Sequence, residues 1–148
     1  MTEFAALEDA ADALIAAFDV TTPPVPIDTI MVTPRPGMWP KIDLSQLTLS
    51  FTSRGDRFAP RISVARLVVR QLVYTEWGKQ HRLPELVGDD SSKIIDFGRM
   101  ILMPRSLIDG MPAKEQTPIG VAMSFMVPED DAEARLKLRT LKSDTDTV

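Results

Sequence analysis

The sequence predicts an α+β fold in which a small antiparallel sheet packs against a bundle of helices. Two observations predict the helices: apolar residues recur at helical spacing over residues 3–18, and again over residues 65–77. A third observation predicts the sheet, because residues 47–51 alternate apolar and polar side chains as a half-buried strand does.

The composition indicates an ordinary globular chain. Of the 148 residues, 44% are apolar and 26% are charged, which suits one domain with a buried core. We therefore expect a single domain over residues 1–142 and a disordered polar tail over residues 143–148. No apolar run approaches the roughly 18 residues that span a bilayer, and no signal-peptide pattern opens the chain, so we expect a cytoplasmic protein without membrane contact.

The N-terminal half is predicted to hold two helices followed by the sheet. The helix over residues 3–18 ends before the prolines that begin at Pro23, and a short helical turn follows over Ile27 to Met31. Beyond the strand at residues 47–51, Arg61 to Val64 are expected to form the next strand, with a third strand around Lys41 to Leu44.

The C-terminal half is predicted to be mainly helical. The helix over residues 65–77 is followed by a polar connection from His81 to Asp90. Ser91 or Ser92 is then expected to cap a further helix, which closes at Met103-Pro104.

Two short helices are expected at the end of the chain, over Thr117 to Phe125 and Pro128 to Lys142. Pro128 suits the first turn of the second helix, and the three acidic residues after it favour a helix N-terminus. The run Ile119 to Val127 is also compatible with a buried strand, because periodicity alone does not separate the two for so short a segment.

Four motifs occur in order along residues 5–141. A Pro-Pro-Val-Pro element starts at Pro23, the helix over residues 65–77 follows, and a second apolar helix closes with Phe97 to Pro104. The last motif is the C-terminal helix pair. In this order the motifs resemble the ImmA/IrrE family of bacterial and phage metallopeptidases. The resemblance implies a zincin-like core with a C-terminal helix-turn-helix-like pair.

Every position that binds zinc or acts on substrate in that family differs here. The resemblance places the first zinc histidine at Arg70, the general base at Gln71, the second histidine at Tyr74 and the third ligand at Ser91. Arginine repels a cation, and glutamine cannot accept a proton as a base. The chain has one histidine, His81, so no shift of register restores H-E-x-x-H. The resemblance thus implies an inactive peptidase relative with no catalytic residue, metal or cofactor.

Active relatives cleave a repressor or an antitoxin. The resemblance therefore implies a regulatory protein of a phage, a prophage, a stress response or a toxin–antitoxin system. It would bind a protein partner of the repressor or antitoxin type without cleaving it. The candidate binding cleft is formed by Arg66, Arg70, Tyr74, Asp89 and Asp90. A plainer alternative is a structural Arg70–Tyr74 stacking pair, with ion pairs to neighbouring aspartates.

Two other classes of function are weighed against this one. The first is an enzyme that uses Arg70, Tyr74 and Asp89 or Asp90 for chemistry without zinc in the same cleft. The second is a DNA-binding module that acts through the C-terminal helices.

The DNA-binding alternative depends on three basic residues near the C-terminus. Arg135, Lys137 and Arg139 are the candidate nucleic-acid contacts. The acidic residues 129–131 oppose phosphate at the end where recognition helices touch bases, and the net charge of −4 argues against general nucleic-acid binding. A protein partner is therefore the stronger expectation.

Overall fold

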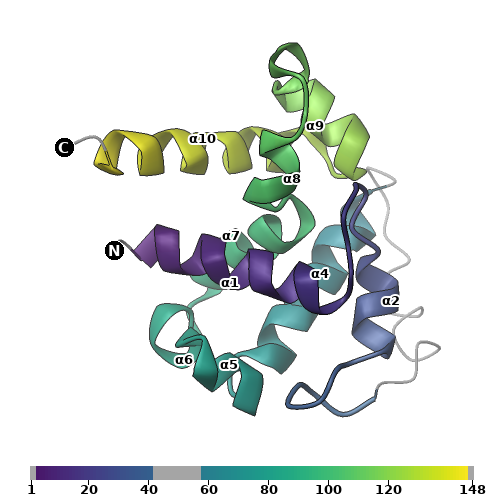
Figure 1. Cartoon of the computed structure of the whole chain (residues 1–148), viewed down its shortest axis with the longest axis vertical. Helices are drawn as coiled ribbons and strands as arrows, with labels where there is room; N and C mark the ends of the chain where they lie inside the picture. Colours follow the sequence, from purple (N-terminus) through teal and green to yellow (C-terminus); the bar gives the residue numbers. More distant parts are fainter. Residues whose placement is uncertain (1–2, 42–57, 147–148) are drawn as a thin grey trace.

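The computed structural model describes residues 3–41 and 58–146, with side chains described as far as residue 139 (Figure 1). All regular secondary structure in these ranges is helical. In chain order the elements are α1 (Glu3–Ala17), α2 (Ile27–Val32), α4 (Ala59–Leu72), α5 (Glu76–Gln80), α6 (Leu83–Leu86), α7 (Ser91–Leu102), α8 (Arg105–Asp109), the 3₁₀ turn η1 (Ala113–Glu115), α9 (Pro118–Phe125) and α10 (Glu129–Asp146).

The predicted α+β fold, with its antiparallel sheet and zincin-like core, is wrong for the part of the chain that the structure describes. Residues 61–64, expected as a strand, lie inside α4. Pro60 occupies the first turn of that helix, where its missing N–H costs no hydrogen bond. The other two expected strands, at residues 47–51 and around Lys41 to Leu44, fall wholly or mostly outside the described residues.

Arg61 explains why its segment is helical. From the first turn of α4 its guanidinium donates to the carbonyl oxygens of Val25 (2.7 Å), Phe125 (3.3 Å) and Met126 (2.9 Å). The last two carbonyls lie at the C-terminal end of α9, where helix carbonyls have no partner within the helix. Arg61 therefore joins α4 to α9 and to the segment before α2.

The predicted helix over residues 65–77 is two helices. α4 ends at Leu72, and α5 begins at Glu76 after Thr75, whose hydroxyl accepts from the Gly78 N–H at 3.0 Å. A Cβ on Gly78 would lie 2.2 Å from the Leu72 carbonyl oxygen. The tight turn between the helices therefore requires glycine at position 78.

The central helix of the fold is α7, which packs against α4, α1 and α10. Phe97 and Met100 on α7 are fully buried, as are Leu14 on α1 and Leu72 on α4. A Cβ on Gly98 would lie 3.7 Å from Ala65, so α4 and α7 approach closely at this point. α4 and α7 cover most of the two helices that were predicted over residues 65–77 and from Ser91 to Met103. They pack against each other and against further helices.

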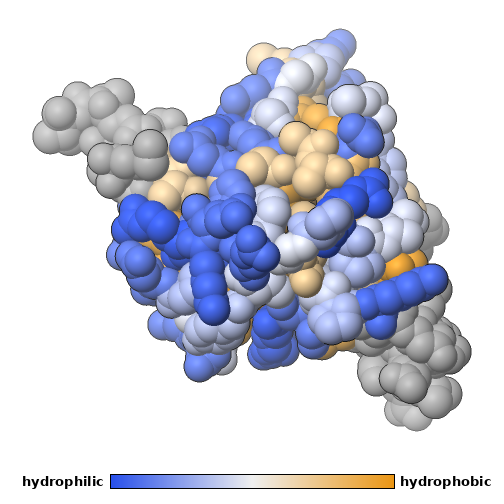
Figure 2. Space-filling view, turned by 60° about the horizontal axis from the view of Figure 1, so that its bottom comes forward, coloured by the Kyte–Doolittle hydropathy of each residue, from blue (hydrophilic) through white to orange (hydrophobic). Residues whose placement is uncertain are grey.

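The connection between α5 and α7 was expected to be polar and irregular, but it contains α6. Leu83, Leu86 and Val87 of this segment are buried. Figure 2 brings forward the side of the molecule that carries α5 and α6. On this side, hydrophilic residues cover more of the surface than hydrophobic residues do.

The two predicted C-terminal helices are confirmed, and the strand alternative for residues 119–127 is wrong. α10 extends to Asp146 and so includes residues 143–146 of the segment that was expected to be a disordered tail. Figure 1 shows its C-terminal part projecting from the rest of the chain. Within the described ranges, no helix combines the length and the apolar character that crossing a bilayer requires.

Candidate functional site

The end of α4 and the start of α7 meet at the predicted cleft. Tyr74 follows α4 and is 52% exposed, and its hydroxyl lies beside Gly88 and Asp89 in the turn before α7. Partial desolvation and the neighbouring Asp89 carboxylate raise the pKa of Tyr74 above its ordinary value of 10.0, so the phenol is neutral at pH 7. Tyr74 and Asp89, two of the predicted cleft residues, are thus neighbours.

Asp90 has a structural role beside Tyr74 and Asp89. It is the N-cap of α7, and its carboxylate accepts from the Ser92 N–H (2.9 Å), the Ser92 hydroxyl (2.7 Å) and the Lys93 N–H (3.2 Å). These hydrogen bonds, led by that from the Ser92 hydroxyl, lower the pKa of Asp90. Ser91 or Ser92 was expected to cap α7. Instead Ser91 is the exposed first residue of the helix.

Arg70 and Gln71 are exposed on the last turn of α4. In the described part of the chain, Arg70 forms no ion pair with Asp89, Asp90 or Asp96; Asp96 pairs with Arg99 at 3.7 Å. The structural stacking pair that was weighed for Arg70 and Tyr74 is not observed there either. The Arg70 guanidinium is therefore available to a partner.

Arg66 differs from the other predicted cleft residues. Its side chain lies one turn before Arg70 and is only partly exposed, and its Nε is buried without a hydrogen-bond partner. The exposed residues Arg70, Gln71, Tyr74 and Asp89, called the Tyr74 face below, are therefore the part of the cleft that a partner can reach.

The one histidine of the chain, His81, is the remaining residue that could bind a metal ion. Its ring stacks on Trp77, with centroids 3.8 Å apart, and desolvation lowers the pKa of the imidazole. Among the residues that the structure describes, no three histidine or acidic side chains come together as a metal site would require. This arrangement assigns His81 a packing role.

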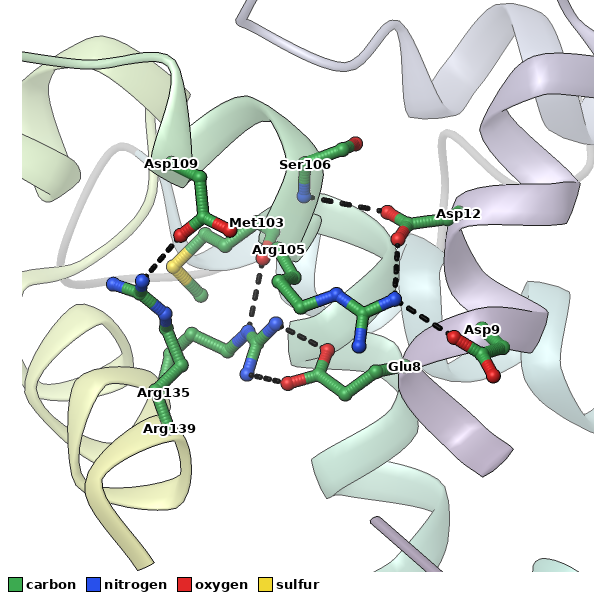
Figure 3. Close-up of polar contacts among 9 residues, drawn as sticks. All are labelled: Glu8, Asp9, Asp12, Met103, Arg105, Ser106, Asp109, Arg135 and Arg139. Atoms are coloured by element: carbon green, nitrogen blue, oxygen red, sulfur yellow. Dashed lines mark hydrogen bonds and ion pairs between the residues drawn. The ribbon is translucent and has the colours of Figure 1, made fainter. Parts of the chain in front are cut away.

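Two of the three candidate nucleic-acid contacts, Arg135 and Arg139, are engaged within the protein (Figure 3). Arg135 has 0% side-chain exposure and donates to both Glu8 carboxylate oxygens, at 2.9 and 2.5 Å, and to the Met103 carbonyl at 2.9 Å. It cannot present its guanidinium to a phosphate. Ala132, one turn earlier, is also buried, so helical spacing would have placed Arg135 on the inner face.

The other two candidate nucleic-acid contacts are Arg139 and Lys137. Arg139 pairs with Asp109 and donates to Gln116, whereas Lys137 is exposed and pairs with Glu133 at 3.4 Å on its own helix. Lys137 alone among the three predicted contacts projects into solvent.

A further ion-pair group lies beside Arg135 and was not predicted. Arg105 at the start of α8 pairs with Asp9 (2.8 Å) and Asp12 (2.9 Å) on α1. Together with Glu8 and Arg135, these side chains join α1, α8 and α10 (Figure 3). The carboxylates at helical spacing on α1 were the sequence signal for it.

The chain matches no protein-family model, no curated protein and no solved structure.

Proposed function

We propose that this protein is a regulatory module that binds a protein partner through the Tyr74 face and does not cleave it. The observation that carries this proposal is the exposed Tyr74 after α4, whose hydroxyl lies beside Gly88 and Asp89 at the start of α7. In the resemblance to the ImmA/IrrE family, zinc ligands occupy positions 74 and 91 on these two segments. Here the same region presents Arg70, Gln71 and Tyr74.

The chemistry of the Tyr74 face suits protein recognition. Tyrosine and arginine are enriched among the residues that contribute most to protein–protein affinity. Tyr74 offers an exposed ring whose hydroxyl lies near the Asp89 carboxylate. Arg70 offers a planar guanidinium, which can bind a carboxylate through two hydrogen bonds.

The supporting helices make the face rigid before a partner arrives. α4 and α7 pack along their length, and Leu72 and Val73, which precede Tyr74, are buried. The backbone that carries Tyr74 is therefore ordered before binding, so less conformational entropy is lost when a partner binds.

The resemblance supports a partner of the repressor or antitoxin type. The motif order on which this resemblance rests includes two helices that correspond to α4 and α7, and these two helices pack together here. The predicted antiparallel sheet has no part in the proposed function. Arg70 further favours a partner segment that carries a carboxylate at the contact.

The test is photo-crosslinking in the native host, with a benzophenone amino acid at position 74 or position 119. Ile119 on α9 is the matched control, since it is 60% exposed and Tyr74 is 52% exposed. We expect a discrete adduct from position 74 that contains an intact repressor or antitoxin, and no such adduct from position 119. The same adduct from both positions, no adduct from position 74, or a cleaved partner in the adduct would refute the proposal.

A further inference from the structure

A cavity of about 180 Å³ lies between the loop after α2 and helix α5. Its walls are Pro36 and Gly37 from the loop and Glu76, Trp77 and Gln80 from α5. It is separate from the Tyr74 face, none of whose residues lines it.

The cavity is built by one backbone contact. The Trp77 N–H donates to the Gly37 carbonyl oxygen at 2.9 Å and so holds the loop against α5. Gly37 has a φ of +84°, a conformation that strains residues with a side chain. A Cβ there would lie 3.7 Å from the Trp77 backbone nitrogen, which is an ordinary contact, so the backbone conformation and not the space favours glycine here.

Trp77 lines the cavity, and its indole is held by stacking with His81. His81 stacks on the indole, with ring planes 26° apart, and His81 does not line the cavity. Tryptophan is the side chain that attracts a cation most strongly through its ring face.

Glu76 gives the cavity a carboxylate. The side chain is exposed, and within the described part of the chain no hydrogen bond or ion pair engages it. Gln80 lies one helical turn later and adds an amide oxygen that accepts hydrogen bonds. Among the described residues no basic side chain lines the cavity, and the Glu76 carboxylate favours a cation over an anion there.

We infer that this cavity binds a guanidinium group. A buried cavity of about 150 Å³ can hold benzene, so about 180 Å³ is sufficient for a planar guanidinium with part of its stem. The group would stack on Trp77 and donate two parallel hydrogen bonds to Glu76. A neutral ring would leave the Glu76 carboxylate partly desolvated and without a partner.

The test is an NMR titration that follows the Trp77 indole N–H of the full chain. The probes are methylguanidinium, N-acetyl-arginine methylamide and the neutral citrulline analogue of the second. We expect saturable shifts with a guanidinium probe, a dissociation constant on the order of 1 mM, and no saturation by citrulline. Binding of methylguanidinium alone would identify a free small molecule, whereas equal or tighter binding of the arginine amide would identify a protein arginine.

Two substitutions test the role of the carboxylate. Glu76→Gln keeps the shape and removes the charge, and we expect binding to weaken about tenfold. Glu85→Gln is the matched control, because it removes an exposed carboxylate on the adjacent helix α6 that does not line the cavity. A Trp77 signal unmoved by either guanidinium probe, equal binding of citrulline, or equal weakening by both substitutions would overturn the inference. None of these outcomes depends on the Tyr74 face.

Discussion

Glu8 and Arg135 lie 127 positions apart in the sequence and form a two-point ion pair with 1% and 0% side-chain exposure. The pair joins α1 to α10, and the third hydrogen bond of Arg135 reaches the Met103 carbonyl at the end of α7. Desolvation lowers the pKa of Arg135, and the Glu8 carboxylate opposes that shift. The charges are retained because each satisfies the other in the interior.

Removing the carboxylate from this pair should strongly destabilise the protein. We expect Glu8→Ala to lower the free energy of unfolding by about 3–5 kcal/mol, because a buried guanidinium is left without a counter-charge. The double variant Glu8→Leu with Arg135→Met should recover much of this loss. Urea denaturation of the three proteins measures both effects.

The exposed pair on the same helix is the control for this prediction. Glu133→Ala breaks the contact with Lys137, whose side chain is 74% exposed, and should cost at most about 0.5 kcal/mol. Equal losses in Glu8→Ala and Glu133→Ala would contradict the account of the buried pair.

Two glycines should respond in opposite directions to the same substitution. In Gly78→Ala the new Cβ meets the Leu72 and Val73 carbonyl oxygens, at 2.2 and 2.4 Å, and the backbone must move. We expect a loss of about 3 kcal/mol. In Gly98→Ala the nearest atoms lie at 3.7 Å, and the helix propensity of alanine should add up to about 1 kcal/mol of stability.

Thermal and urea unfolding of both glycine variants check this contrast. Gly78→Ala more stable than Gly98→Ala would show that the turn between α4 and α5, or the approach of α7 to α4, differs from the one described here.

The Asp90 cap should make stability depend on pH in the acid range. Its pKa is lowered from the ordinary value of 3.8, so the charged cap stabilises the folded state above that value. The contribution is lost as the pH falls through the lower pKa of the folded state. Asp90→Asn keeps a cap without the charge, so its urea midpoint should approach that of the wild type as the pH falls below about 4.

Asp89→Asn is the matched control for this pH series, because Asp89 is the neighbouring carboxylate and does not cap α7. An identical pH dependence of the urea midpoint in the wild type and in Asp90→Asn would rule out the charged cap.

The sequence placed most helices correctly and failed where a short pattern fits two structures. Proline and helical spacing located α1, α2, α7, α9 and α10 within a few residues. The alternation over Ile62, Ser63 and Val64 suits a strand equally well, and the packing of Arg61 against three carbonyls determines the helix. α6 was missed because a four-residue helix has too few positions to show a period.

The site was predicted in part, and the misses have a common cause. Tyr74 and Asp89 were grouped through the resemblance and are neighbours, whereas Arg66 is largely covered. Arg135 was assigned to the surface by its charge, although the periodicity of α10 places it inside. The partner that makes this burial possible, Glu8, lies 127 positions away, and spacing within α10 does not identify it.

The most direct test of the central claim is a calorimetric titration with the partner captured at position 74. We expect wild type to bind it, Tyr74→Ala to weaken binding at least about tenfold, and Met123→Ala, at an exposed position on α9, to leave affinity unchanged. The intact mass of the partner should be the same before and after incubation. Unchanged affinity in Tyr74→Ala, or a shortened partner, would contradict the claim that this face binds without cleaving.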